Sequence, residues 1–168
     1  MTNNLLSPNQ PAPDIRMEAV ESGRVIIPAR PDARYLALLF QSQKTARALA
    51  DVQDTVRERF PKADDVRIVS VVDLRSVPRM FSGMAKSALK RAYDSAGEHL
   101  PPGWQPADYV VILPDWKGDF FKAFGVTDAD NEAVAVVINT DGMIIASRQG
   151  AALGQFVLDA VVAAEQTP

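Results

Sequence analysis

Tyr35-Leu36-Ala37-Leu38-Leu39-Phe40 is the stretch that decides the fold, a continuous apolar run between Pro31-Asp32 and Gln41-Ser42. A strand covered by helices on both faces has this composition, because neither side of it meets water. The period then changes, and apolar residues recur every three or four positions, as on one face of a helix, at Leu49, Val52, Val56 and Phe60. Residues 66–72 (VRIVSVV) form a second apolar run. Strand, helix and strand of these lengths predict a right-handed βαβ unit.

The rest of the chain extends this unit in both directions. The lead-in at residues 1–14 contains Pro8, Pro11 and Pro13 and is predicted to be irregular. The other predicted elements are an edge strand at 24–28, a helix at 78–97, a third parallel strand at 109–113, a short helix at 117–124, strands at 133–138 and 143–147, and a helix at 150–165. The last two strands form a hairpin, for which Asp141-Gly142 is predicted to supply positive φ angles. This order predicts one domain over residues 1–168, an α/β three-layer sandwich whose mixed central sheet has helices on both faces.

Composition excludes several kinds of chemistry. The 168 residues include no cysteine, so disulfides, thiolate metal sites and cysteine nucleophiles are absent. His99 is the only histidine, and with no partner at a recognisable spacing it is interpreted as a surface residue. No nucleotide-binding or serine-hydrolase motif occurs. We therefore expect no metal and no cofactor.

Charge and hydropathy limit the partners and the compartment. The chain has 18 basic and 21 acidic residues, a net charge of −3, which gives no overall basic footprint for nucleic acid or anionic lipid. No apolar run approaches the ~18 residues of a membrane helix, and the first residues lack the features of a signal peptide. We expect neither a nucleic-acid nor a membrane partner and a cytoplasmic location, with the periplasm as the alternative if a leader has been removed.

Three stretches resemble known families. Residues 8–14 (PNQPAPD) resemble the opening of peroxiredoxins, and Phe124-Gly125-Val126 with residues 135–142 (AVVINTDG) resembles the ending shared by thioredoxin-like proteins. Residues 76–84 (SVPRMFSGM), taken with 109–115 and 134–150, look like the YtfJ family of thioredoxin-like bacterial proteins. The resemblance implies a thioredoxin-like, peroxiredoxin-like fold.

The departures from these families concern the reactive positions. In the peroxiredoxin pattern Thr45 matches the threonine, but Ala48 stands at the position of the peroxide-attacking cysteine and Gln41 at that of the proline. Ala133 stands where thioredoxins have a cis-proline and peroxiredoxins an arginine. The resemblance therefore implies a protein that lacks the redox cysteines, and we assign no catalytic residue.

Thr45, Asp73, Arg79 and Asp115 are candidate ligand-binding residues. Thr45 precedes a helix and could bind an anion with neighbouring basic side chains, although we favour the interpretation that it caps the helix. Asp73 and Asp115 follow parallel strands, at the sheet edge where open α/β proteins bind ligands. Arg79 could join them, and two close carboxylates could hold a hard cation. The competing interpretation is that each aspartate caps the following helix.

A group of aromatic residues forms a candidate interface: Trp104, Trp116, Phe120 and Phe121. A short helix cannot bury both faces, so at least one of Phe120 and Phe121 is expected to point outward, and self-association into a homodimer follows as a hypothesis. The alternative is that these rings pack onto the sheet within one chain.

Three functions remain open. The first is a cysteine-free, non-redox binding or regulatory module for a protein or small ligand. The second, which rests on resemblance alone, is an antioxidant- or oxidoreductase-related protein whose thiol is supplied by a partner. The third is a hydrolase that uses Asp73 and Asp115.

Overall fold

A five-stranded mixed sheet forms the centre of the computed structural model, which describes residues 3–167. The strands lie in the order β5-β4-β3-β6-β7. Their bounds are Tyr35–Gln41 (β3), Val66–Asp73 (β4), Ile112–Asp115 (β5), Val134–Asn139 (β6) and Ile144–Gln149 (β7). β3 pairs in parallel with β4 from Tyr35↔Val66 to Gln41↔Val72, and antiparallel with β6. The predicted βαβ unit and the fold class are confirmed.

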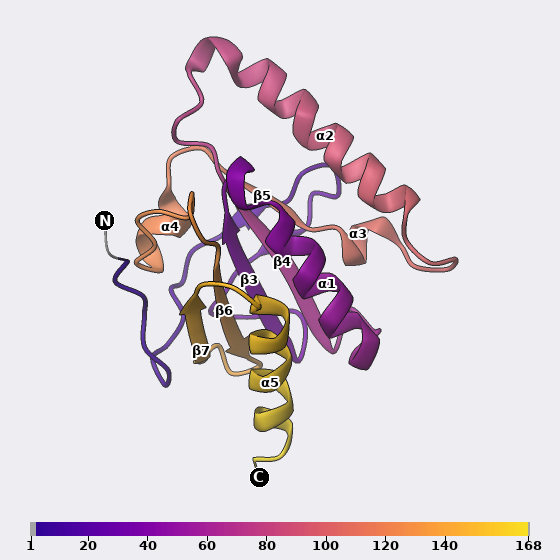
Figure 1. Cartoon of the computed structure of the whole chain (residues 1–168), viewed down its shortest axis with the longest axis vertical. Helices are drawn as coiled ribbons and strands as arrows, with labels where there is room; N and C mark the ends of the chain where they lie inside the picture. Colours follow the sequence, from indigo (N-terminus) through magenta and orange to yellow (C-terminus); the bar gives the residue numbers. More distant parts are fainter. Residues whose placement is uncertain (1–2, 168) are drawn as a thin grey trace.

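Helices cover both faces of this sheet (Figure 1). They are α1 (Arg47–Arg59), α2 (Ser82–Glu98), α3 (Pro106–Tyr109), α4 (Asp119–Ala123) and α5 (Leu153–Glu165), with single 3₁₀ turns η1 (Gln43–Thr45) and η2 (Arg79–Phe81). α1 and α5 pack on one face, where Val52, Val56 and Val157 meet the odd-numbered side chains of β3. α4 and the N-terminal segment pack on the other face.

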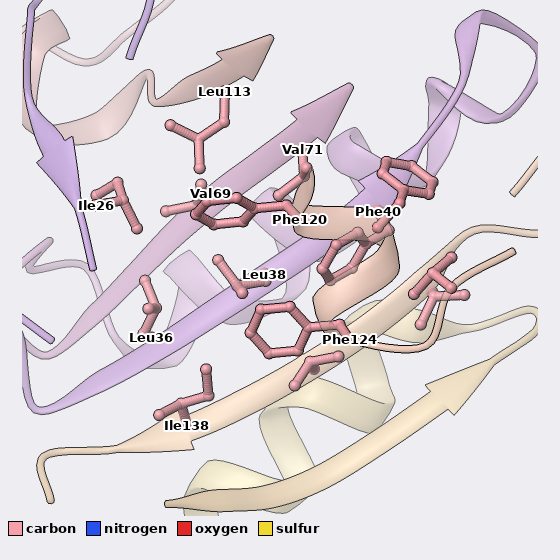
Figure 2. Close-up of a cluster of buried hydrophobic side chains, with 14 of the residues drawn as sticks. Ile26, Leu36, Leu38, Phe40, Val69, Val71, Leu113, Phe120, Phe124 and Ile138 are labelled. Atoms are coloured by element: carbon pink, nitrogen blue, oxygen red, sulfur yellow. The ribbon is translucent and has the colours of Figure 1, made fainter. Parts of the chain in front are cut away.

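Four phenylalanines dominate the second face. Phe40 of β3 contacts Phe121 edge to face, with ring centroids 5.2 Å apart, and lies 5.3 Å from Phe124. Phe120, Phe121 and Phe124 are all fully buried, and Figure 2 shows Phe120 and Phe124 among the side chains of the strands. The prediction that Phe120 or Phe121 points outward is therefore wrong. Both sit in the core because α4 is a short helix between the sheet and the N-terminal segment, and its exposed side is formed by Asp119 and Lys122.

Two predicted strands differ from the structure. Val25 and Ile26 form β2, which pairs only with β1 (Met17–Glu18), so this strand is not an edge of the main sheet. The third parallel strand begins at Ile112 and not at Tyr109, because Pro106 opens the short helix α3. Tyr109 ends that helix and its hydroxyl donates to the Pro61 carbonyl at 2.8 Å.

The hairpin between β6 and β7 is confirmed, with a different turn. Only Gly142 has positive φ, at 77°, and its N–H donates to the Asn139 carbonyl at 3.0 Å. A turn over residues 139–142 that ends in a left-handed glycine is the longer hairpin connection, not the two-residue one. The N-terminal lead-in lies against this hairpin, since Asn9 and Ala12 donate backbone hydrogen bonds to the carbonyls of Ile144 and Gly142.

Candidate functional site

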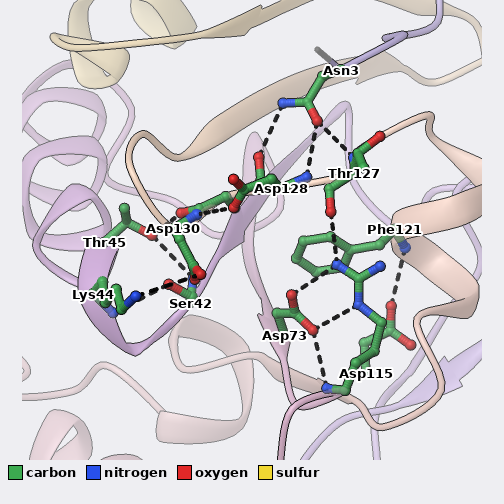
Figure 3. Close-up of polar contacts among 12 residues, drawn as sticks. Asn3, Ser42, Lys44, Thr45, Asp73, Asp115, Phe121, Thr127, Asp128 and Asp130 are labelled. Carbon is green, nitrogen blue, oxygen red and sulfur yellow. Dashed lines mark hydrogen bonds and ion pairs between the residues drawn. The ribbon is translucent and has the colours of Figure 1, made fainter. Parts of the chain in front are cut away.

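Residues 41–48, which the resemblance aligns with the reactive segment of peroxiredoxins, form a closed helix start. The Ser42 hydroxyl accepts from the Lys44 N–H at 3.2 Å, and the Thr45 hydroxyl accepts from the Ser42 N–H at 3.0 Å. Thr45 also donates to the Ala129 carbonyl at 2.8 Å, which ties the helix start to the loop before β6 (Figure 3). The single O–H donor of Thr45, which an anion would need, is therefore used within the protein, and the cap accounts for Thr45 without an anion.

Alanine occupies the two positions at which the resemblance predicts reactive residues in redox families. Ala48 lies in the first turn of α1 and packs against the core under α1 and α5. Ala133, which is buried, directly precedes β6, and its carbonyl accepts from the Gly150 N–H at 3.2 Å. Neither alanine side chain can donate, accept or ionise, so neither position supplies a nucleophile.

Asp73 and Arg75 form a closed ion pair at the end of β4. The guanidinium donates from Nε to Asp73 Oδ1 at 2.9 Å and from Nη2 to Oδ2 at 2.8 Å. Partial burial alone would raise the pKa of Asp73, but hydrogen bonds from the Arg75 side chain and backbone outweigh it and hold that pKa below its ordinary value. Arg75 also donates to the Thr127 carbonyl and lies over the Phe121 ring (Figure 3). These contacts connect the end of β4 to α4 and to the loop that follows α4.

Asp115 is a buried helix cap. Its Oδ1 accepts from the Asp119 N–H at 2.9 Å and its Oδ2 from the Phe121 N–H at 3.0 Å, so both oxygens serve the start of α4. Burial raises the pKa of Asp115 above its ordinary value, and these backbone hydrogen bonds offset only part of that rise. The capping interpretation fits this residue.

The structure brings Asp73 and Asp115 together but leaves Arg79 apart. The two aspartates are cross-strand partners in the β4–β5 register. Arg79 lies in η2 and is exposed, with no hydrogen bond to either carboxylate. Within residues 3–167 no group of three metal-ligating side chains is close enough to hold an ion. With Asp73 held by Arg75 and Asp115 by backbone N–H groups, the pair offers no free carboxylate for hydrolysis.

A large groove lies between α1 and α2. Two successive right-handed crossovers in the same direction place both helices on one face of the sheet, where packed helices normally approach to about 8–10 Å. α2 has no buried residue and does not pack closely against α1. The side of α2 that lines the space between the helices carries Leu89, Ala92 and Ala96, and the two alanine side chains are too short to reach across. The space left has a volume of about 940 Å³, at the upper end of the usual range for ligand sites.

The lining of this groove is mostly apolar. α1 contributes Ala46, Leu49 and Ala50 to one wall, and α2 contributes Leu89, Ala92 and Ala96 to the other. The floor is formed by Ser70, Val72 and Ile112, and one end is closed by Leu100, Pro101, Trp104 and Tyr109. Trp104 stacks on Tyr109, with the ring centroids 4.2 Å apart. His99 lines the rim and is exposed, with its Nδ1 2.7 Å from the Ser95 carbonyl.

Two polar side chains in this lining have unused hydrogen-bonding atoms. Gln41 is 6% exposed, its Nε2 donates to Ser70 Oγ at 2.8 Å, and its Oε1 has no partner. Arg57 donates from Nη1 to three backbone carbonyls, while its Nε and Nη2 are buried without a partner. Burial lowers the pKa of Arg57 to about 10. Such orphaned atoms are costly when buried, and a bound polar group relieves that cost.

The candidate interface is dispersed over different parts of the molecule. Trp104 is half-buried at the closed end of the groove, and Trp116 is half-buried beside Lys86, 5.9 Å from its ring. Phe120 and Phe121, as core residues, cannot belong to a surface patch. The homodimer stays a prediction that has lost two of the side chains on which it rested.

Solved structures with this fold include redox proteins. An exposed thioredoxin lipoprotein of Streptococcus pneumoniae superposes with a TM-score of 0.62 at 16% identity, over 90% of this chain and 99% of that one. A thiol:disulfide interchange protein of Chlorobium tepidum, described as putative, gives 0.58 at 16% identity over 93% and 99%. The peroxiredoxin AhpC of Mycobacterium tuberculosis gives 0.57 at 16% identity over 96% and 94%. At these identities the likeness shows the fold: the chain has a thioredoxin-like fold and no cysteine.

No family model and no curated protein sequence matches the chain. The resemblance to the YtfJ family therefore stays a prediction. No helix within residues 3–167 is both long enough and apolar enough to cross a bilayer.

The groove is the feature that the sequence-based interpretation missed. The apolar residues of the helix at 78–97 had the right spacing for a buried face, which predicts packing and not a gap. One signal was present: Gln41, at the end of an otherwise wholly apolar strand, is a buried polar residue that needs a partner on one face of the sheet.

Proposed function

We propose that the protein is a non-redox, thioredoxin-fold binding protein whose site is the groove between α1 and α2. The proposed ligand is an elongated, mainly apolar small molecule with a neutral polar head such as a primary amide. The observation that supports it most strongly is the buried Gln41 with its free Oε1 in the wall of a groove of about 940 Å³.

The polar head is assigned to the Gln41 end of the groove. One end of the Gln41 amide is held by Ser70, and the other is free in either orientation of that amide. A primary amide offers both a donor and an acceptor, so it pairs with Gln41 whichever way the side chain is turned.

The length of the ligand follows from the strand beneath the groove. Ser70 lies at the Gln41 end, and Arg57 bonds the Val66 carbonyl at the opposite end. Ser70 lies four residue steps along β4 from Val66, which is roughly 13 Å of extended chain. An alkyl chain of comparable length, flanked by Leu49 and Leu89, would occupy the apolar part.

Titration with decanamide tests this function, with the fluorescence of Trp104 as the signal. Replacing Trp116 by phenylalanine leaves Trp104, which lines the groove, as the only tryptophan. We expect saturable quenching or a spectral shift in this background. Ala50→Phe, which fills the groove, abolishes the response, whereas Ala163→Phe on the exposed side of α5 leaves it intact. Equal responses in the two phenylalanine variants would refute the site.

Gln41→Leu tests the assignment of the head group. Removing the amide that pairs with decanamide is expected to weaken its binding by about fivefold, since one net hydrogen bond to a neutral group is worth about 1 kcal/mol. The binding of decane, which has no polar group, is expected to stay the same or to improve. Equal losses for decane and decanamide would contradict the assignment. Thermal unfolding of the variant checks that the Gln41–Ser70 region remains folded.

The predicted cytoplasmic location is part of the same proposal. Recognition of a ligand by apolar contacts and neutral hydrogen bonds requires no oxidising compartment. Immunofractionation of the native host would test the location directly.

A further inference from the structure

Positive charge is concentrated in one segment of this otherwise acidic chain. Between Leu74 and Tyr93 lie five of the 18 basic residues and none of the 21 acidic ones. Two of the five are engaged with carboxylates, Arg75 with Asp73 and Lys90 with Asp94 and Glu21. Within residues 3–167, no carboxylate forms an ion pair with the other three basic residues of the segment, Arg79, Lys86 and Arg91.

The same segment exposes large apolar side chains. Met80 is 81% exposed, Met84 69% and Phe81 47%. Among the described residues the one other exposed large hydrophobic is Val25, at 37%. A group of this kind on one surface is unusual for a soluble protein and typical of an interaction site. We call Met80, Phe81 and Met84 the apolar tip.

The apolar tip lies at one end of the molecule. η2 and the start of α2 form the extreme upper end of the longest axis in Figure 1, away from the sheet. In α2, Met84, Ser87 and Arg91 follow at helical spacing and are all exposed, so apolar and cationic groups share one outward side. A flat surface can approach such an end without contact from the rest of the chain.

We propose that the apolar tip docks on the surface of an anionic lipid bilayer. Met80, Phe81 and Met84 enter the boundary between headgroups and acyl chains, while Arg79, Lys86 and Arg91 lie beside the lipid phosphates. Basic residues around a protruding apolar group match the two requirements of an interfacial anchor. This proposal is independent of the ligand in the groove.

Charge and shape favour a bilayer over an acidic protein. The remainder of the chain carries all the acidic residues, so an anionic surface repels the body and attracts the tip, which orients the molecule. A projecting end with flexible methionine side chains inserts into a fluid layer, whereas a protein partner would need a matching hollow. The sequence-based expectation of no membrane partner relied on the net charge of the whole chain. A net charge does not show that basic residues are concentrated in one segment.

Co-sedimentation with vesicles tests the proposal. The full chain is expected to bind vesicles that contain phosphatidylglycerol, not vesicles of phosphatidylcholine alone, and binding should fall as salt is added. Neutralising Arg79, Lys86 and Arg91 together by glutamine is expected to lower the partition coefficient by on the order of 100-fold, because each basic residue near an anionic surface contributes about fivefold. Glutamine at Arg16, Arg59 and Lys62, exposed basic residues elsewhere, is the matched control.

A second triple variant tests the apolar contribution. Serine at Met80, Phe81 and Met84 is expected to abolish sedimentation, whereas Val25→Ser leaves it unchanged. These side chains are exposed, so the variants should retain the circular dichroism spectrum of the wild type. Absence of wild-type binding to phosphatidylglycerol vesicles, or binding that neither triple variant weakens, would overturn the proposal. Retention on immobilised polyglutamate without vesicle binding would overturn it in favour of an acidic protein partner.

Discussion

Asp115 caps the start of α4 with both of its carboxylate oxygens, which accept from the N–H groups of Asp119 and Phe121. Asparagine has only one acceptor oxygen, so Asp115→Asn leaves one buried N–H facing an amide donor. We expect the free energy of unfolding in urea to fall by about 1–3 kcal/mol at neutral pH. The exposed neighbour Asp119→Asn is the control, with an effect within about 0.5 kcal/mol. Equal stability of the two variants would contradict the capping role.

The contribution of Asp73 to stability depends on pH in the opposite direction to that of a carboxyl whose pKa is raised by burial. Its pKa in the folded protein lies below the ordinary 3.8, so the folded state releases this proton more readily than the unfolded chain. The stabilisation by Asp73 is therefore fully present above that value and is lost as the pH falls through the folded pKa.

The measurement is urea unfolding of the wild type and of Asp73→Asn over a series of acidic pH values. The difference between them is expected to be about 0.5–1 kcal/mol at neutral pH, because the pair is partly exposed, and to approach zero in strong acid. Asp54→Asn, at an exposed position without an ion pair, should show no such convergence. A difference that does not change with pH would mean that Asp73 contributes through packing and not through charge.

At the scale of elements, Gly142 is the residue on which the hairpin depends most. Its φ is 77°, and a Cβ there would overlap the carbonyl of Ala29. Gly142→Ala is expected to lower the free energy of unfolding by about 1–3 kcal/mol. Gly83→Ala, in α2 with open space around it, is the matched control and should stabilise the protein by about 0.5–1 kcal/mol. Thermal or urea unfolding of both variants shows whether the loss of stability is specific to position 142 or follows any replacement of glycine.

The sheet was predictable because its signals are local. Apolar runs at 35–40 and 66–72, with helical spacing between them, determine the parallel pair and its covering helix, and both appear in the structure. The fate of Phe120 and Phe121 depended on the N-terminal segment that packs over α4, a contact between distant parts of the chain. Likewise, spacing shows that α2 is amphipathic but not whether its apolar side meets α1. Asp73 and Asp115 were expected at the ends of parallel strands, and the structure makes them cross-strand partners. Their hydrogen-bond partners, the Arg75 side chain and the α4 backbone, could not be read from the sequence.

The molecule as a whole has a thioredoxin-like fold but lacks the cysteines on which thioredoxin chemistry depends. Reduction of a peroxide or disulfide on this fold needs a low-pKa thiolate, and the chain has no cysteine. We expect no disulfide reductase or peroxidase turnover by the purified protein above a protein-free control with the same added thiol. Turnover that survives repurification would revive the alternative of an oxidoreductase-related role. Adding purified candidate partner proteins to the assay tests whether a cysteine from outside the chain is used.

The space between α1 and α2 is proposed to be a ligand site, and the two tryptophans allow binding there to be measured directly. Trp104 lines the groove, whereas Trp116 lies outside it beside Lys86. In a ¹⁵N-labelled sample of the wild type, each gives a separate indole N–H resonance. We expect decanamide to shift the Trp104 resonance in a saturable manner and to leave that of Trp116 in place. A Trp104 resonance that does not move, or equal shifts of both resonances, would contradict it.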